Sequence, residues 1–175
     1  MLQTCSIMAA RSLLILGAGG LGQDAAEIAR MTGEYSHIAF LDDSLVTHRD
    51  VLGRISEMEQ FAGVFSAAIC AIGKNEVRLQ LHQKLIELGY RVPALVHPHA
   101  SVSGSVQLAS GCIVRAGAVI GHSVRIDEAC LINIRAVVDH GCEIGAGAHI
   151  PIGCIIRNEV KVPELSAYIP NQVVE

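Results

Sequence analysis

The chain has 175 residues, 13 Lys and Arg against 17 Asp and Glu, and a formal net charge of −4. This balance, without basic runs or clustered aromatic residues, argues against a nucleic-acid partner. Hydrophobic residues make up 51% of the chain but aromatic residues only 3%, so we expect aliphatic cores. The six cysteines contain no C-x-x-C pair, which indicates reduced thiols in a cytoplasmic protein. No signal peptide or membrane-spanning stretch is recognisable, and we expect no membrane partner.

Residues 1–10 are expected to be a disordered lead-in, and residues 11–95 alternate between strand and helix patterns. The predicted elements are a strand over 12–16, a helix over 23–31, a strand over 37–41, a loop with a short helix over 44–64, a strand over 67–72, a helix over 76–88 and a strand over 91–95. Each prediction follows from the period of the apolar residues. Strands that alternate with helices indicate a small parallel α/β domain.

From residue 96 onward the pattern has a period of six. An aliphatic or aromatic residue occupies every sixth position from Val96 to Val174, and a small or β-branched residue follows four positions after each of the first twelve. Neither a helix nor an ordinary strand has this period, whereas the hexapeptide repeats of a parallel β-helix do. We therefore predict an α/β domain over 11–95 followed by a parallel β-helix over 96–175.

The repeat also predicts which residues lie above one another. Three repeats make a coil of about 18 residues, and successive coils are about 4.8 Å apart, as strands in a sheet are. His122 is then expected directly below His140, and Cys112 below Cys130. The cysteines of the repeat fall at its small inward position, so we interpret them as core residues. No metal site is predicted, because such a site needs several convergent ligands.

The first predicted strand runs into a glycine-rich turn with the spacing G-x-G-x-x-G. Its glycines are Gly17, Gly19 and Gly22, with a further glycine at Gly20, and Asp42 ends the second predicted strand. Such a turn lets backbone N–H groups approach a diphosphate at a helix N-terminus. An acidic residue about 20 positions later is the usual partner of a ribose hydroxyl in a Rossmann-like domain.

Three interpretations of this turn remain open. A full dinucleotide domain uses two βαβαβ halves, and residues 11–95 provide room for one half, which favours a nucleoside diphosphate. Binding of NAD(P) and a glycine turn without any ligand are the alternatives.

A second candidate site follows the repeat anchor Val138. Asp139 and His140 lie in a turn between two predicted strands, and histidine is the side chain best suited to accept a proton near neutral pH. Asn133 is expected to present its amide toward the same face. His149 lies half a coil further along, on a different side of a single prism, and approaches His140 only across an interface between subunits. A solvated loop histidine without a function is the alternative interpretation.

Several segments together resemble the bacterial NeuD/PglD-type sugar acetyltransferases, which comprise sialic acid O-acetyltransferases and UDP-4-amino-sugar N-acetyltransferases. The resemblance covers residues 12 to about 162. It rests on the segments LLILGAGGLG, AFLDD, AIGKNEVR, LVHPHASVS, LINIRAVVDHGCEIG and AHIPIG. It implies that the β-helix is left-handed, that the protein is a homotrimer of surface polysaccharide or glycan biosynthesis, and that acetyl-CoA binds between subunits.

The same resemblance implies residue roles. His140 is the expected general base, supported by Asp139, and Asn133 is a substrate contact. The nucleotide-sugar pocket is expected from the glycine turn, Asp42, Asp43, Gly73 and Asn75. The expected contacts to acetyl-CoA are His149, Gly153 and Asn158. Family members usually carry Glu or Asp directly after the catalytic histidine, where this chain has Gly141.

The leading hypothesis is an acetyltransferase that acts on a nucleotide-linked amino sugar, such as a UDP-amino sugar, or on a sialic acid-like sugar. The sequence does not decide between N- and O-acetylation. The alternative is a nucleotide-sugar-binding protein of acetyltransferase ancestry, impaired in catalysis by Gly141 and by an expected shortening of the β-helix. A third hypothesis is a small NAD-dependent domain fused to a structural β-helix.

Overall fold

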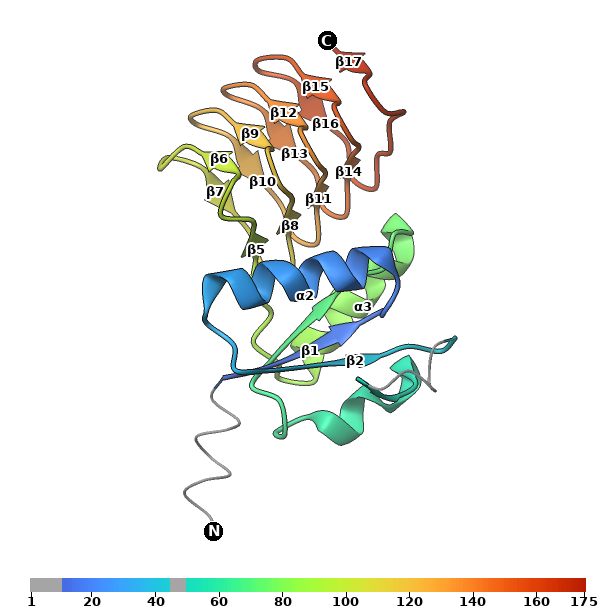
Figure 1. Ribbon diagram of the computed structural model, residues 1–175. Helices are drawn as coiled ribbons and strands as arrows, with labels where there is room; N and C mark the ends of the chain where they lie inside the picture. Colours follow the sequence, from blue (N-terminus) through green and yellow to red (C-terminus); the bar gives the residue numbers. More distant parts are fainter. Residues whose placement is uncertain (1–10, 45–49) are drawn as a thin grey trace. The chain divides into compact units, whose positions relative to one another are not determined.

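The computed structural model describes residues 11–44 and 50–175, which form two compact units (Figure 1). The first unit runs to Gly73 and resumes over Gln80–Pro93, and the second comprises Lys74–Leu79 and Ala94–Glu175. The expected lead-in over 1–10 lies outside the described residues. The second unit thus begins with a short segment, Lys74–Leu79, that precedes the repeat in the sequence.

The first unit is built on a parallel sheet of four strands in the order β3-β2-β1-β4 (Figure 1). Its elements in chain order are β1 (Ser12–Leu16), α2 (Gly20–Thr32), β2 (His37–Leu41), β3 (Val51–Gly53), the 3-10 helix η1 (Ile55–Phe61) and β4 (Ala67–Cys70). Strand β1 pairs with β2 on one side and β4 on the other, and all of its residues are buried. This central position explains why β1 is apolar throughout.

Two parts of this unit differ from the sequence prediction. The strand expected over 91–95 is reduced to one bridge between Arg91 and Ala67, and Leu95 begins β5 (Leu95–Val96) of the second unit. Pro93 explains the interruption, because proline has no N–H to donate to a sheet. Strand β3 was not predicted, since three residues are too few to show a period.

Helix α3 (Asn75–Glu87) follows β4 and ends beside Gly89, which adopts a left-handed φ of 81°. Glycine tolerates this conformation, which is common directly after a helix. The first turns of α3 belong to the second unit and the remainder to the first.

The second unit is a parallel β-helix whose strands start every six residues from Leu95 to Lys161 (Figure 1). After β5 its strands are β6 (Ser101–Val102), β7 (Gln107–Leu108), β8 (Ile113–Val114), β9 (Val119–Ile120), β10 (Arg125–Ile126), β11 (Leu131–Ile132), β12 (Val137–Val138), β13 (Glu143–Ile144), β14 (His149–Ile150), β15 (Ile155–Ile156), β16 (Lys161–Val162) and β17 (Val173–Val174). They form three sheets, ordered β14-β11-β8-β5, β17-β15-β12-β9-β6 and β16-β13-β10-β7. Partners within a sheet are 18 residues apart, as Val137 and Ile155 are, which confirms the predicted coil.

Aliphatic and small side chains fill the interior of the β-helix, as the repeat predicted. The cysteines Cys112, Cys130, Cys142 and Cys154 are fully buried, and the Cys142 thiol donates to the carbonyl of Arg157 at 2.9 Å. Burial raises the pKa of the Cys142 and Cys154 thiols. These thiols therefore stay protonated, and their interpretation as core residues is confirmed.

One turn residue in every six adopts a left-handed backbone conformation. Glycine occupies this position at 111, 117, 141, 147 and 153, with φ between 66° and 73°. Other residues occupy it at Ser123, Ala129, Arg135, Glu159, Leu165 and Asn171, with φ between 55° and 61°. Gly141 is thus at a position where glycine avoids the strain that an L residue carries.

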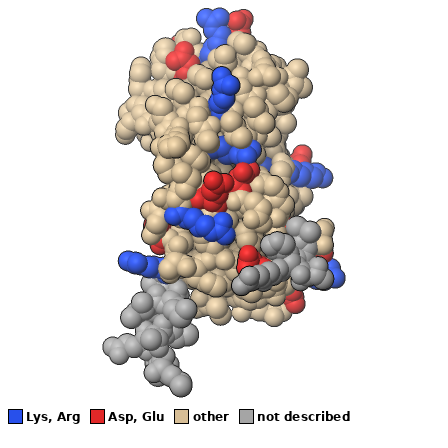
Figure 2. Space-filling model, viewed as in Figure 1, with Lys and Arg blue, Asp and Glu red and all other residues tan. Residues whose placement is uncertain are grey.

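The three sides of the β-helix differ in character. The outward residues of one sheet form an apolar column, which we call the apolar face: the exposed Val119, Ile155 and Val173 and the half-buried Val137. A second sheet carries the charged column Arg125, Glu143 and Lys161, in which Lys161 pairs with Glu143 at 3.4 Å. In the third sheet Leu95, Ile113 and Leu131 are buried. Figure 2 shows mainly uncharged side chains on the visible surface of the β-helix.

Candidate nucleotide-binding loop and active site

The glycine turn after β1 is tightly built at its two ends and open in the middle. Gly17 donates its N–H to the carbonyl of Leu41 at 2.8 Å and has a φ of 101°. A Cβ at Gly22 would collide with the carbonyl of Gly17, so only glycine fits there. Gly19 and Gly20 are exposed, with no heavy atom near a hypothetical Cβ. The N-terminus of α2 therefore presents an accessible backbone, which suits a diphosphate.

Asp42 lies at this turn, and its carboxylate accepts hydrogen bonds from the backbone of the neighbouring loops. Its Oδ2 accepts the N–H of Ala18 at 2.8 Å, and its Oδ1 accepts the N–H of Ser44 at 2.8 Å. Asp43 accepts the N–H of Ile55 at 3.0 Å. Both carboxylates thus organise the carboxyl edge of the sheet, and a ligand contact would come in addition to these bonds.

The loops after β1 and β4 meet where the order of the sheet reverses. Chain connections leave β1 toward β2, whereas β4 lies on the opposite side of β1. A Cβ at Gly17 would lie 2.8 Å from the Ile72 side chain, and the exposed Gly73 follows directly. Ligands of parallel α/β sheets bind at such reversal points. The predicted residues Gly17, Gly19, Gly20, Gly22, Asp42 and Gly73 all lie along this edge.

Asn75 was expected at the same edge, but the structure places it in the second unit. Its side chain is buried, and its Nδ2 donates to the carbonyls of Leu165 and Ser166 at 3.1 Å. Its Oδ1 accepts from Arg78 at 2.9 Å. These bonds hold the start of α3 to the β-helix, and a substrate contact by Asn75 stays a prediction.

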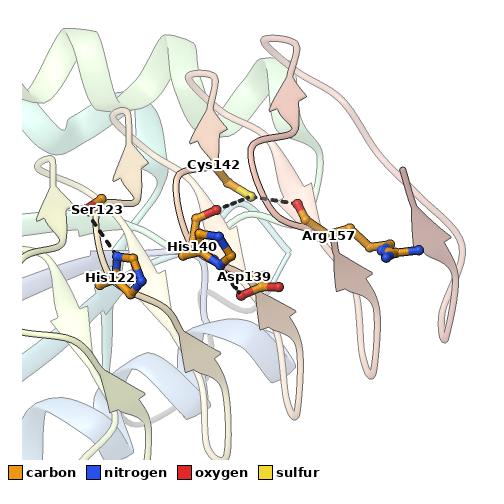
Figure 3. Close-up of polar contacts among 6 residues, drawn as sticks. All are labelled: His122, Ser123, Asp139, His140, Cys142 and Arg157. Atoms are coloured by element: carbon orange, nitrogen blue, oxygen red, sulfur yellow. Dashed lines mark hydrogen bonds and ion pairs between the residues drawn. The ribbon is translucent and has the colours of Figure 1, made fainter.

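The catalytic candidates Asp139 and His140 form a hydrogen-bonded pair in the turn between β12 and β13 (Figure 3). The Asp139 Oδ1 lies 3.0 Å from His140 Nδ1 and also accepts the His140 backbone N–H at 2.7 Å. These hydrogen bonds from His140 lower the pKa of Asp139. An ionised Asp139 favours a proton on Nδ1 and leaves Nε2 as the basic atom.

Neighbouring coils hold this turn in place. The His122 ring stacks on the His140 ring with centroids 5.0 Å apart, which confirms the predicted column (Figure 3). The Gly141 N–H donates to the carbonyl of His122 at 3.1 Å. A Cβ at Gly121 would lie 2.9 Å from the His140 backbone nitrogen. Gly121 was not identified from the sequence, although it lies 18 residues before Asp139.

Asn133 and His149 form a second cluster, on a different side of the prism from His140. The Asn133 Nδ2 lies 3.1 Å from His149 Nε2, and Arg115 donates to Asn133 Oδ1 at 2.7 Å. The expectation that Asn133 faces the same way as His140 is therefore corrected, since Asn133 follows β11 and His140 follows β12. Arg115 was missed, although its position 18 residues before Asn133 marks it as the neighbour below.

The environment of His149 keeps its imidazole neutral. Burial and the positive charges of Arg78 and Arg115 lower the pKa of His149. Arg78 is fully buried and donates to the carbonyls of Ala129 and Gly147 at 2.8 Å. No local pattern in the sequence identifies Arg78 as a neighbour of the β-helix.

The remaining predicted contacts lie further along the coils. Gly153 lines a groove of about 330 Å³ on the β-helix. The groove is lined by Arg135, Val137, Ile152, Gly153, Ile155 and Asn171. Asn158 is exposed and lies one coil beyond His140 in the register that pairs Val138 with Ile156. The groove borders the apolar face, through Val137 and Ile155.

Comparison with known proteins connects both units to one enzyme group. Residues 12–85 match the PglD N-terminal domain family. The acetyltransferase domain of PglB from Neisseria gonorrhoeae is 29% identical, with a TM-score of 0.86 over 94% of this chain and 91% of that chain. The chain is thus similar to sugar acetyltransferases of the NeuD/PglD type in its first unit and in its overall architecture. It is an acyltransferase in which a small α/β domain precedes a left-handed parallel β-helix.

Two further structures extend the comparison to ligand complexes. The PglB domain in complex with acetyl coenzyme A is 28% identical, with a TM-score of 0.80 over 93% of each chain. PerB from Caulobacter crescentus, in complex with CoA and GDP-perosamine, is 26% identical, with a TM-score of 0.80 over 94% of this chain and 88% of that chain.

The described parts of the chain contain no helix long and apolar enough to cross a membrane. Within the same residues, no group of three or more His, Cys, Asp or Glu side chains could hold a metal ion.

Proposed function

We propose that the protein transfers an acetyl group from acetyl-CoA to the amino group of a nucleotide-linked sugar. The observation that carries this proposal is the 3.0 Å pair of Asp139 and His140 Nδ1, which leaves His140 Nε2 as the basic atom. The accessible glycine turn supplies a place for the nucleotide diphosphate, and the related PerB structure holds a nucleotide-linked sugar together with CoA. An intact acid–base pair also favours catalysis over the binding-protein alternative.

In the proposed reaction His140 acts as the general base. The sugar nitrogen attacks the thioester carbonyl carbon while His140 Nε2 takes a proton from that nitrogen. The tetrahedral intermediate collapses, the carbon–sulfur bond breaks, and the proton on His140 passes to the CoA sulfur. Asp139 stabilises the imidazolium that exists between these steps. An N–H donor is needed for the developing oxyanion, and we assign this role to His149.

We infer that the active unit is a homotrimer. The apolar face exposes 44% of Val119 and 39% of Ile155, while another side of the prism is charged. Apolar faces of this kind are typical of subunit interfaces. The groove at Gly153 borders this face, and we propose that acetyl-CoA binds there, between two subunits. His140 of one subunit would then meet the His149 cluster of another.

The nucleotide-linked substrate would bind at the carboxyl edge of the first unit, with Asp42 and Asp43 organising the loops. We place the reaction in the cytoplasm and in the biosynthesis of a surface polysaccharide or another glycan. N-acetylation is preferred to O-acetylation because the sugar held by the related PerB is an amino sugar, perosamine. The nucleotide would be a nucleoside diphosphate, and UDP- and GDP-linked amino sugars are the compounds to compare.

A thiol-detection assay for CoA release tests this function directly. Purified protein is incubated with acetyl-CoA and either a UDP-linked or a GDP-linked amino sugar, with the corresponding N-acetylated sugar as a control. We expect CoA release only with a free amino group on the sugar. Release that does not depend on the amino sugar, or no release with either nucleotide, would argue against the proposed reaction.

Mixing two inactive variants tests the shared site. His140→Ala and His149→Ala are each expected to be strongly impaired, and mixed trimers would contain sites in which His140 and His149 are both present. We expect activity to return after the two variants are unfolded together and refolded. No recovery, with trimers formed, would mean that each site is built from one subunit.

A further inference from the structure

Two donors determine the orientation of the Asn133 side-chain amide. The Arg115 guanidinium donates to Asn133 Oδ1 at 2.7 Å, and the backbone N–H of Ile134 donates to the same atom at 2.8 Å. A guanidinium and a backbone N–H only donate, so the atom they share must be the amide oxygen. The amide nitrogen then faces His149 Nε2, at 3.1 Å. The network therefore excludes the flipped amide.

This orientation determines the tautomer of His149. An amide NH₂ group only donates, so His149 Nε2 must accept and carries no proton. A neutral imidazole with an unprotonated Nε2 holds its proton on Nδ1. No residue in 11–44 or 50–175 forms a hydrogen bond with this Nδ1. His149 thus presents an N–H group that is available to a ligand.

The same contacts oppose protonation of His149. A second proton, on Nε2, would face the NH₂ group of Asn133 and break the hydrogen bond. Burial lowers the pKa of His149, and the positive charges of the fully buried Arg78 and of Arg115 lower it further. Geometry and electrostatics therefore agree on a neutral imidazole that donates from Nδ1.

We propose that Arg115 is a positioning residue, which acts through Asn133 to hold His149 as a neutral Nδ1–H donor. The use of that donor rests on the proposed function: it meets the thioester carbonyl oxygen as negative charge develops there. The two histidines then have separate roles, since His140 accepts a proton at Nε2 and His149 donates a hydrogen bond. His149 cannot replace His140 as the base while its only free nitrogen carries a proton.

We call the hydrogen bonds that lead from Arg115 through Asn133 to His149 the relay. Nitrogen NMR of the intact protein, with ¹⁵N-labelled histidine, tests this relay without any substrate. The His149 signals are assigned by their absence from a His149→Gln variant. We expect the shift of Nε2 in the range of an unprotonated imidazole nitrogen and that of Nδ1 in the protonated range. A protonated Nε2 in the wild-type protein would overturn the proposal, whatever the variants do.

Asn133→Asp is the decisive variant because it changes shape very little. Its carboxylate still accepts from Arg115 and Ile134, but the atom facing His149 becomes an acceptor. We expect His149 to gain a proton on Nε2 and to titrate at a higher pH than in the wild type. An unchanged tautomer and titration in this variant would refute the relay.

Substitutions of Arg115 separate positioning from folding. Arg115→Lys keeps a donor for Asn133 Oδ1 and should keep the Nδ1–H tautomer, whereas Arg115→Met should yield a mixture of both. Arg125→Met, on the charged side of the β-helix, is the matched control and should leave His149 unchanged. Identical His149 spectra for Arg115→Met and the wild type would show that Arg115 has no positioning role.

Kinetics connect the relay to the reaction. Loss of an oxyanion donor typically costs about 10²–10³ in kcat, so Asn133→Asp and Arg115→Met should lower kcat with little change in KM for the nucleotide sugar. Arg115→Lys should restore most of the loss. If the spectra are as expected but neither the wild type nor any variant transfers acetyl groups, the relay is supported and the proposed function is wrong. If transfer occurs and the spectra contradict the tautomer, the relay alone is wrong.

Discussion

The imidazole ring of His122 lies one coil below that of His140, with centroids 5.0 Å apart and planes inclined by 22°. The His122 Nδ1 contacts the Ser123 hydroxyl at 3.3 Å, whereas the His140 Nδ1 contacts the Asp139 carboxylate at 3.0 Å. Two similar rings are therefore distinguished by their neighbours. Of the two rings, His140 is the one that is hydrogen-bonded to a carboxylate, which can stabilise a positive charge after proton transfer.

Replacement of His140 is expected to remove catalysis and leave nucleotide binding intact. His140→Ala should lower kcat by roughly 100-fold or more, the scale of a lost general base. Binding of the free nucleoside diphosphate, measured by calorimetry, should be unchanged because the glycine turn belongs to the other unit. Asp139→Asn should cost less, since it alters the partner of the base and keeps the base. Equal activity of His140→Ala and wild type would show that another group accepts the proton.

Gly121 is expected to be required for the geometry of the catalytic turn. A Cβ at Gly121 would lie 2.9 Å from the backbone nitrogen of His140, so Gly121→Ala must shift the turn. We expect kcat to fall by about 10-fold or more, because such displacements misalign the base. Gly104→Ala is the control, since a Cβ at Gly104 has no neighbour within 4 Å. A similar loss in both variants would disprove this explanation.

Gly141→Asp introduces the acidic residue that the resemblance predicts directly after the proposed catalytic histidine, but the substitution has a conformational cost. Gly141 has a φ of 71°, and an L residue in this region costs about 1–2 kcal/mol. Chemical denaturation should therefore show a lower free energy of unfolding. Glu159→Gly, at the same turn position with a φ of 61°, should not be destabilising. An unchanged stability of Gly141→Asp would show that the turn absorbs the strain.

The stability of the β-helix is expected to depend on the protonation of His149. Its folded-state pKa is lowered, chiefly by burial and then by Arg78 and Arg115. Below the unfolded-state pKa of about 6.5 the unfolded chain takes up a proton while the folded protein does not. The stability that the neutral His149 contributes above this pH is therefore lost as the pH falls through the folded-state pKa. Urea unfolding between about pH 7.5 and 5 should show a weaker decline for His149→Gln. Parallel declines in both proteins would contradict this assignment.

A charge on the apolar face is expected to dissociate the proposed trimer. Ile155 lies between Val137 and Val173 in this column, so Ile155→Glu would place three charges in the interface of a trimer. Light scattering should show trimers for the wild type and monomers for the variant. Arg125→Glu, on the charged side, is the control and should remain trimeric. A monomeric wild type at micromolar concentration would exclude the trimer.

The period of six predicted most of the second unit because one short pattern encodes both strand and turn. It placed His122 under His140, and the ring stack confirms this. The same coil length would also have predicted Arg115 below Asn133 and Gly121 below Asp139. The 18-residue register alone is enough to predict these neighbours.

Other contacts leave no trace in the sequence. Asn75 binds the carbonyl of Leu165, which is 90 residues away and lies outside any repeat that includes Asn75. The acidic residue of the glycine motif is similarly ambiguous, because the motif does not tell whether Asp42 bonds a ligand or the loop at Ala18. The prediction of a strand over 91–95 was wrong because Pro93 has no N–H to donate to the sheet, although the residues around it are apolar.

The coil also determines which changes of length the protein tolerates. A side chain in the β-helix meets the residues one coil away, as Val138 meets Ile120 and Ile156. Insertion of one residue before Asp139 would shift all later residues by one position relative to the coil below. Outward side chains would then point into the core. Insertion of one whole coil would instead leave every column continuous. Natural variation in this domain is therefore expected to occur in steps of complete coils, with the catalytic turn carried unchanged past each added layer.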